Sequence, residues 1–138
     1  MTSILASLAG LGPFALYFVV SLLLLIVFKY VYTTITPHDE WQLVKEHHNT
    51  AAALGLGGAI VGFALALGSA AQHSVSLVDF VIWGVAALLA QCLAFALVRF
   101  ILMPRIVAQI TANEVPAGII LGAVSIAVGV LNAACITY

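Results

Sequence analysis

Charged side chains are scarce in this sequence: of 138 residues, four are Lys or Arg and five are Asp or Glu, so only 7% are charged. A soluble domain carries about 25% charged residues and is about 45 to 50% apolar, whereas 64% of the residues here are hydrophobic. The mean hydropathy is +1.24. So few charges cannot cover a water-soluble surface. No basic run marks a nucleic-acid-binding face either, and we expect no nucleic-acid partner.

Cysteine is equally rare. The two cysteines, Cys92 and Cys135, lie within apolar runs, without the paired spacing of a disulfide framework or a zinc site. We interpret them as small packing residues. No cysteine or serine has a nearby base in the sequence that would activate it as a nucleophile. The sequence therefore predicts a protein that is not an enzyme and has no cofactor and no metal.

Long apolar runs make up most of the chain. Roughly 20 apolar residues cross the hydrocarbon core of a bilayer as a helix, and a helix satisfies its own backbone polar groups there. We expect an all-α integral membrane protein with four transmembrane helices. These run from about Pro13 to Tyr32, from Thr50 to Ala71, from Leu77 or Val78 to Ile101, and from Pro116 to Tyr138.

The first 28 residues contain no Lys or Arg, unlike a signal peptide, which begins with a basic region. We therefore expect the first apolar run to stay in the mature protein as an anchor. Residues 1 to 11 form either a short interfacial piece or an extension of the first helix, and the sequence leaves both open.

One markedly polar stretch, TPHDEWQLVKEHHNT, follows the first apolar run. Thr36, Pro37 and Asp39 have the order of a helix start, with a hydroxyl N-cap, a proline at the first position and a carboxylate after it. The pattern predicts a short interfacial helix from Pro37 to His47, with Trp41 turned toward lipid or protein. Asn49 is the expected N-cap of the second transmembrane helix.

All the basic residues lie in or beside two of the connections between the expected helices. Lys29 and Lys45 belong to the connection between the first and second helices, and Arg99 and Arg105 to that between the third and fourth. The positive-inside rule places such connections in the cytoplasm. We therefore expect the short helix to be cytoplasmic and both termini to lie on the non-cytoplasmic side.

The run from Asn49 to Ala71 has a fainter copy from Asn113 to Cys135. A shift of 64 residues aligns Asn49 with Asn113 and Gly58 with Gly122. We interpret the chain as two parallel two-helix repeats, residues 1–75 and 76–138, related by a pseudo-two-fold axis along the membrane normal. Chance similarity between two Gly- and Ala-rich helices is the alternative.

Small residues recur four positions apart in both copies: Gly58 with Gly62, and Gly118 with Gly122. Helices associate in lipid through close van der Waals contact, which small residues permit. We expect the second and fourth helices to pack tightly together and the leucine-rich first helix to face lipid. The alternative is that these glycines leave room for a pore or a ligand.

Polar residues within the expected helices are few. Ser21, Gln91 and Ser125 fall at similar depth near the middle of their helices, and Asn132 lies nearer the end of the fourth. Such residues often form hydrogen bonds between helices, which we favour here. The alternative is a polar belt that lines a permeation path.

The polar stretch also holds potential metal or proton ligands. They are His38, Asp39, Glu40, Glu46, His47 and His48. Zinc needs three or four ligands that converge on one point, but His38 and Glu46 are far apart along a helix, and His47 and His48 point in different directions. A solvated helix is the favoured interpretation, with Glu40 binding Lys45 or backbone donors.

The segments TPHDEWQLVKEHHNTAAA, GGAIVGFALALGSA and LNAACITY resemble the YjfL family of small bacterial inner-membrane proteins, a family of unknown function. The resemblance covers nearly the whole chain and implies four transmembrane helices built from a duplicated two-helix domain, in the bacterial inner membrane. Members also tend to occur beside phage-shock-protein-A-like membrane-maintenance proteins. The family pattern falls on residues without an assigned chemical role: Pro37, Glu40, Asn49, Gly58, Asn113, Asn132, Ala133 and Ala134.

Two functions fit these observations. The first is an oligomeric channel or passive carrier, favoured by the repeat, the glycine-rich helices and the polar belt. The second is a non-catalytic membrane scaffold that docks a cytoplasmic protein partner through Pro37 to His47. Besides membrane lipid, we expect a homo-oligomer in both cases. The candidate functional residues are Glu40, Trp41, Asn49, Asn113 and Asn132.

Overall fold

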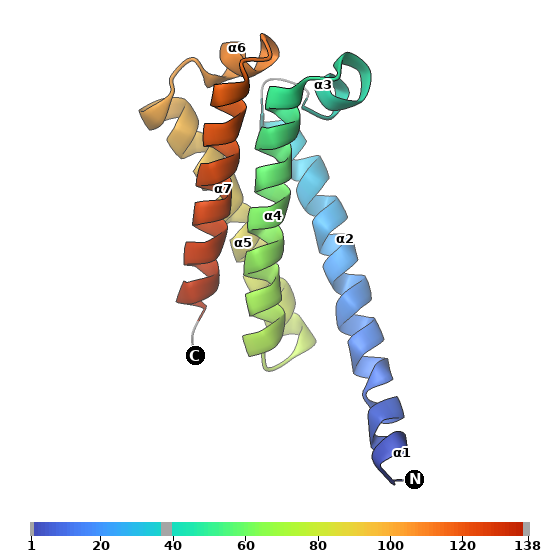
Figure 1. Cartoon of the computed structure of the whole chain (residues 1–138). Helices are drawn as coiled ribbons and strands as arrows, with labels where there is room; N and C mark the ends of the chain where they lie inside the picture. Colours follow the sequence, from blue (N-terminus) through green and yellow to red (C-terminus); the bar gives the residue numbers. More distant parts are fainter. Residues whose placement is uncertain (1, 37–39, 137–138) are drawn as a thin grey trace.

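The computed structural model of the chain describes residues 2–36 and 40–136, and within these ranges all regular elements are helices (Figure 1). The side chains of Thr2 and Glu40 lie outside the described ones. In chain order the helices are α1 (Thr2–Ala9), α2 (Leu11–Ile35), α3 (Glu40–His47), α4 (Thr50–His73), α5 (Leu77–Leu97), the π-helical turn η1 (Val98–Leu102), α6 (Ile106–Thr111) and α7 (Val115–Cys135).

Four helical segments among the described residues are long and apolar enough to cross a membrane. They are Ser3–Ile35, which joins α1 to α2, then Thr50–His73, Leu77–Leu102 and Val115–Cys135. At 1.5 Å per residue, 21 to 33 residues extend for about 30 to 50 Å, enough for a hydrocarbon core of about 30 Å. Over the described residues, the prediction of an all-helical chain with four segments long and apolar enough to span a membrane is confirmed.

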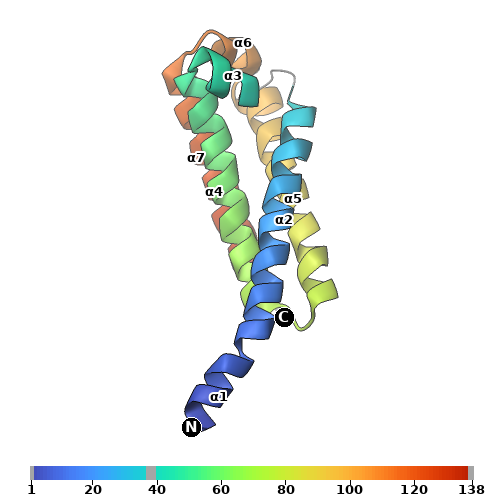
Figure 2. The same ribbon diagram turned by 90° about the vertical axis from the view of Figure 1, so that its right-hand side faces the viewer.

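The four long helices alternate in direction along the chain (Figures 1 and 2). α2 and α5 run toward one end of the bundle, and α4 and α7 run away from it. α3, α6 and the turns beside them gather at that end, which we call the polar end. The N-terminal helix α1, the end of α7 and the short turn between α4 and α5 lie at the opposite end.

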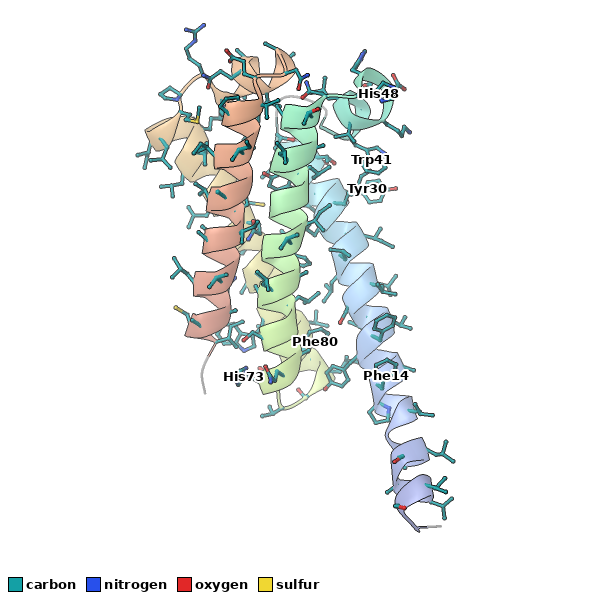
Figure 3. All side chains as sticks on the ribbon, in the orientation of Figure 1. Phe14, Tyr30, Trp41, His48, His73 and Phe80 are labelled. Carbon is teal, nitrogen blue, oxygen red and sulfur yellow. The ribbon has the colours of Figure 1, made fainter. Side chains whose placement is uncertain are left out.

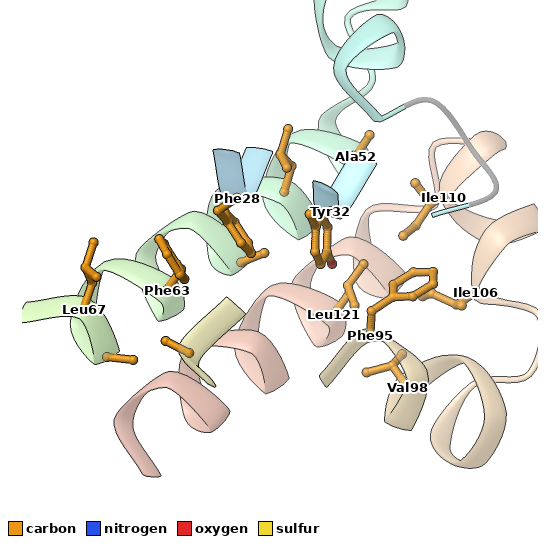
Figure 4. Packing of buried hydrophobic residues seen from close by; sticks show 14 of the residues in the cluster. Phe28, Tyr32, Ala52, Phe63, Leu67, Phe95, Val98, Ile106, Ile110 and Leu121 are labelled. Atoms are coloured by element: carbon orange, nitrogen blue, oxygen red, sulfur yellow. The ribbon is translucent and has the colours of Figure 1, made fainter. Parts of the chain in front are cut away.

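The centre of the bundle is the pair α4 and α7, with α5 packed against both. α2 lies at the periphery, and only Phe28 and Tyr32 among its residues are buried. Three aromatic side chains attach it to the other helices. Phe28 stacks on Phe63 of α4 with ring centroids 4.5 Å apart, and Tyr32 meets Phe95 of α5 edge-on at 6.0 Å (Figure 4). Tyr17 lies against Phe80 of α5, with ring centroids 5.3 Å apart. Because α2 buries few side chains, most of its leucines face outward, the surface that a bilayer would cover.

Local sequence explains where the helices begin. The Asn49 side chain caps α4 by accepting a hydrogen bond from the Ala52 N–H at 2.8 Å, which confirms the predicted cap. Ser76 caps α5 in the same way, accepting from the Asp79 N–H at 3.1 Å. Asp79 in turn accepts from the Val75 N–H at 3.1 Å, so a hydroxyl and a carboxylate three residues apart satisfy donors that the first turn leaves free.

Two prolines explain where helices are interrupted. Pro13 has no N–H to donate one turn back, to Ala9, and the break between α1 and α2 lies beside that residue. Pro104 disfavours a helical backbone in the residue before it, and Met103 is accordingly non-helical, with φ −139° and ψ 83°. The last turn of the third segment widens into η1, closed by a 2.7 Å bond from the Met103 N–H to the Val98 carbonyl.

The short helix predicted from Pro37 to His47 is present as α3 over Glu40–His47. Its expected first residues, 37–39, lie outside the described ones, so the predicted proline start stays a prediction. Thr36 ends α2, where its backbone N–H donates to the Tyr32 carbonyl at 3.2 Å.

Candidate functional site at the polar end

Asn49 joins the two turns of the polar end. It is buried, with 4% of its surface exposed. Its side-chain oxygen caps α4, while its Nδ2 donates to the backbone carbonyl of Ile110 in α6 at 2.7 Å. The turn before α4 is thereby attached to the segment before α7, although 61 residues separate the partners.

Asn113 makes the second connection between these turns. Its Oδ1 accepts from the Ala51 N–H of α4 at 3.0 Å. Its own N–H donates to the Ile110 carbonyl at 2.9 Å. The backbone has φ 58°, a left-handed conformation that asparagine tolerates better than most residues. Asn113 therefore caps α4 instead of α7, whose N-cap, Glu114, makes no side-chain cap bond.

A hollow of about 390 Å³ with a partly polar lining opens where the two turns meet. We call it the cap hollow, and its lining residues are Leu43, His47, Asn49, Thr111, Ala112 and Asn113. Both asparagines belong to it, and both turns contribute a wall. Backbone and side-chain hydrogen-bonding groups at a concave surface suit recognition of a polar side chain or a small polar group.

Helix α3 forms one flank of the cap hollow and presents polar groups outward. Leu43 and Val44 are half-buried and pack against the core. On the exposed side, the Gln42 amide donates to the Glu46 carboxylate at 3.0 Å. Trp41 is 42% exposed, so α3 carries an apolar inner side, a polar outer side and a large aromatic between them.

The potential metal ligands are only partly described. His38 and Asp39, and the side chain of Glu40, lie outside the described residues. Over residues 2–36 and 40–136, no three His, Cys, Asp or Glu side chains are grouped closely enough to hold a metal ion. His47 and His48 are both exposed, and His48 has a left-handed backbone with φ 49°.

Two members of the expected polar belt meet inside the bundle. Gln91 of α5 donates from Nε2 to the Ser125 backbone carbonyl of α7 at 3.0 Å, and both residues have no exposed surface. Ser21 instead bonds its own helix, donating to the Tyr17 carbonyl at 2.7 Å. Asn132 is half-buried farther along α7. These contacts place Gln91 and Ser125 in a sealed interior.

The four glycines singled out from the sequence lie between α4 and α7. A methyl group on Gly58 would overlap the Cα of Gly122, and one on Gly118 would overlap the Ala51 backbone. A methyl group on Gly62 would overlap the Ser125 carbonyl oxygen. The two backbones are therefore in direct contact, and glycine is needed there for close approach.

Sequence reasoning missed two further residues of this seam. A methyl group on Gly129 would overlap the Gly62 backbone. Ser69 of α4 donates to the Ala133 carbonyl of α7 at 2.9 Å, near the end opposite the asparagines. A signal was available, because the small residues of α7 recur at intervals of four, three and four, which is the spacing of a helix-packing stripe. Those residues are Gly118, Gly122, Ser125 and Gly129.

Comparison with known proteins gives one family. The model of the Domain of Unknown Function DUF350 matches residues 6–136. The protein named UPF0719 inner membrane protein YjfL of Escherichia coli (strain K12) is 41% identical over 129 residues, which cover 94% of this chain and 96% of the relative. The protein of the same name in Escherichia coli O157:H7 matches equally well. No solved structure is significantly similar to the chain.

Proposed function

The chain belongs to the DUF350 family, and we propose that it is a multi-pass inner-membrane protein that serves as a non-catalytic scaffold. In this proposal the polar end binds a soluble protein partner. The relative that is 41% identical is named as an inner membrane protein, which supports the location. The four apolar helices support a multi-pass arrangement.

The observation that carries the scaffold proposal is the pair of hydrogen bonds between the turns of the polar end. Asn49 donates to Ile110, and Asn113 accepts from Ala51. A docking surface gains affinity when it is ordered before the partner arrives, because less conformational entropy is lost on binding. The bonded turns, the cap hollow and the outward side of α3 together offer such a surface, with Gln42, Glu46 and His47 as polar contacts.

The proposal includes an orientation. Lys29 and Lys45 flank the start of the polar end in α2 and α3, and Arg99 and Arg105 flank the connection through α6. Basic residues near short connections favour retention in the cytoplasm. We therefore assign the polar end to the cytoplasm, α3 to the membrane interface and both termini to the opposite side.

The proposal also retains the duplicated architecture, with residues 1–75 and 76–138 as parallel two-helix repeats. Two contacts along the α4–α7 seam support it. Gly58 meets Gly122, and Ser69 bonds Ala133 across 64 residues of sequence. Both pairs have the separation that aligns the two copies, as expected when a pseudo-two-fold axis runs along the seam.

An oligomeric channel or passive carrier is the second candidate. One observation favours it: among the described residues, the side-chain oxygens Oε1 of Gln91 and Oγ of Ser125 are buried without a hydrogen-bond partner. Water entering between α5 and α7 would satisfy both. The closed seam and the apolar outer face of α4 and α7 weigh against this candidate, because a permeation path needs a polar lining.

Photo-crosslinking in cells tests the scaffold proposal. A crosslinking amino acid is placed at Gln42 or Glu46 on the outer side of α3, and at Val75 in the turn of the opposite end as the matched control. We expect the first two positions, and not the third, to form an adduct with one soluble protein. Mass spectrometry then identifies the crosslinked protein. Binding of that purified protein to the chain embedded in nanodiscs checks the interaction. Adducts at all three positions, or at none, would contradict the proposal.

Flux assays test the channel candidate. Vesicles that contain the purified protein and matched protein-free vesicles are loaded with ions and small solutes of different charge. The scaffold proposal predicts equal leakage from both. Solute-selective flux that depends on protein and is altered by Gln91→Leu would establish the channel instead.

A further inference from the structure

A groove lies between α2, α3 and α4, outside the cap hollow. Its volume is about 470 Å³, within the usual range of ligand pockets. The lining residues are Leu25, Ile26, Lys29, Tyr30, Trp41 and Ile60. We call it the lysine groove. Tyr30 and Trp41 lie close together where α2 approaches α3 (Figure 3).

The mouth of the lysine groove is positively charged and aromatic. The Lys29 ammonium lies 4.4 Å from the ring centroid of Tyr30 and 4.6 Å from that of Trp41. Contact with the two ring faces orients the cation without cancelling its charge, since neither ring carries an opposite charge. Tyr and Trp are enriched at the membrane–water interface, where one side of the ring meets lipid and the other water. The mouth therefore suits an anionic group at the level of lipid headgroups.

The floor of the lysine groove is apolar and runs along the surface of the bundle, away from the polar end. Leu25 and Ile26 of α2 face Ile60 of α4 across it. Ile60 is ten residues beyond Thr50, where α4 begins, which corresponds to a depth of about 15 Å at the rise of an α-helix. The groove thus descends from the headgroup level to the level of acyl chains.

The size of the lysine groove favours a chain narrower than a helix. A helix about 10 Å in diameter fills on the order of 1,200 Å³ over a length of about 15 Å, more than the groove can hold. A helix of a second copy would therefore rest on the rim. An acyl chain can enter, and the ammonium at the mouth complements a phosphate joined to it.

We propose that the lysine groove binds one anionic phospholipid. Its phosphate pairs with Lys29, its glycerol region lies against Trp41 and Tyr30, and one acyl chain follows Leu25, Ile26 and Ile60. The bound lipid attaches α3 to α2 and so fixes the height of α3 at the membrane. This inference is independent of the scaffold proposal, because it requires no protein partner.

Tryptophan quenching by brominated lipids tests the proposal. The chain has two tryptophans, so Trp83→Phe leaves Trp41 as the only one, beside the groove. The protein is placed in phosphatidylcholine vesicles that contain a small, equal fraction of brominated phosphatidylglycerol or brominated phosphatidylcholine. We expect phosphatidylglycerol to occupy the quenching site about fivefold more readily, the preference that one lysine near an anionic lipid provides.

Matched variants identify the cation. In the Trp83→Phe background, Lys29→Gln removes the preference, Lys29→Arg keeps it, and Lys45→Gln on α3 keeps it although it removes the same charge. The complementary Trp41→Phe chain reports from Trp83 in α5, and its emission is quenched equally by both lipids. The helical signal in circular dichroism shows whether each variant is folded. If Lys29→Gln does not fold, Lys29→Arg is used in its place, and it should keep the preference.

Three outcomes would overturn the proposal. Equal quenching of Trp41 by both lipids would mean that the groove does not select an anionic headgroup. An equal loss of preference in Lys29→Gln and Lys45→Gln would mean that only diffuse surface charge acts. Loss of the preference on addition of excess inorganic phosphate would mean that the mouth binds a free anion and that the acyl chain contributes nothing.

Discussion

The side-chain amide of Asn49 donates a hydrogen bond to the backbone carbonyl of Ile110 across 2.7 Å, while the oxygen of the same amide caps α4. One buried side chain therefore orders a helix start and joins it to a second turn. Asn113 repeats the connection from the other side through Ala51. The polar end is held by groups that a single substitution can remove, which makes its role in stability measurable.

Asn49→Ala should lower the free energy of unfolding by about 2 kcal/mol, because a helix cap contributes about 1 kcal/mol and a buried hydrogen bond about as much. Asn49→Ser keeps a capping oxygen but does not reach Ile110, so it should lose about half as much. Unfolding by SDS titration, followed by circular dichroism, gives both values. Equal losses for Ala and Ser would mean that the bond to Ile110 contributes nothing.

Asn113→Gly should cost about 1 kcal/mol, since glycine accepts the left-handed backbone at φ 58° and only the bond to Ala51 is lost. Asn113→Ala adds the strain of that backbone and should cost about 1 to 2 kcal/mol more. The same SDS titration compares the two variants. If they are equally stable, the conformation of Asn113 is not enforced by the turn.

Gly58→Ala should destabilise the chain by about 1 to 3 kcal/mol, the usual cost of overpacking a close contact. The added methyl group would overlap the Gly122 Cα and lie 2.7 Å from its carbonyl carbon, so α4 and α7 must separate. Gly57→Ala is the matched control, because a methyl group there meets nothing within 4 Å. It should leave stability unchanged or raise it slightly through better helix propensity. If Gly58→Ala and Gly57→Ala change stability equally, the close contact between α4 and α7 does not lie at Gly58.

Gln91→Leu should change stability by less than about 1 kcal/mol, because an interhelical hydrogen bond in a membrane averages about 0.6 kcal/mol and the change also removes an oxygen without a partner. Gln91→Glu should cost about 3 kcal/mol, the order of cost for a carboxylate at the centre of a membrane helix. Thermal unfolding in detergent compares the two. A well-tolerated Glu would mean that water reaches this position, which would favour the channel candidate.

The sequence was sufficient to predict the four transmembrane helices and the Asn49 cap. Long apolar runs and capping residues act locally, so their effect can be predicted without knowing which helices pack against them. Of the three polar residues expected at similar depth, Gln91 and Ser125 meet, whereas Ser21 bonds its own helix. The sequence could not show which side of its helix each residue faces, because a helix that is apolar all round has no polar stripe to mark its inner face.

The role of Asn113 could not be predicted from the repeat alone. The alignment with Asn49 suggests that each asparagine starts its own helix, yet Asn113 caps α4 through Ala51. The difference arises because the α4–α7 seam brings the two helix starts together, and because Pro116 at the start of α7 has no N–H that needs a cap. Tertiary proximity decides which donor the side chain serves.

The orientation can be tested by cysteine labelling in intact cells, starting from a chain in which Cys92 and Cys135 are replaced by alanine. Val75→Cys lies in the turn opposite the polar end, where Val75 is 86% exposed. His48→Cys lies at the polar end and is exposed. A membrane-impermeant maleimide should label position 75 in whole cells and position 48 only after the cells are opened, because basic connections stay in the cytoplasm.

The reverse pattern would invert the assignment and move the cap hollow to the outer side. Labelling of both positions in whole cells would indicate dual topology, which a chain with four basic residues can adopt only if their bias is too weak to fix one orientation.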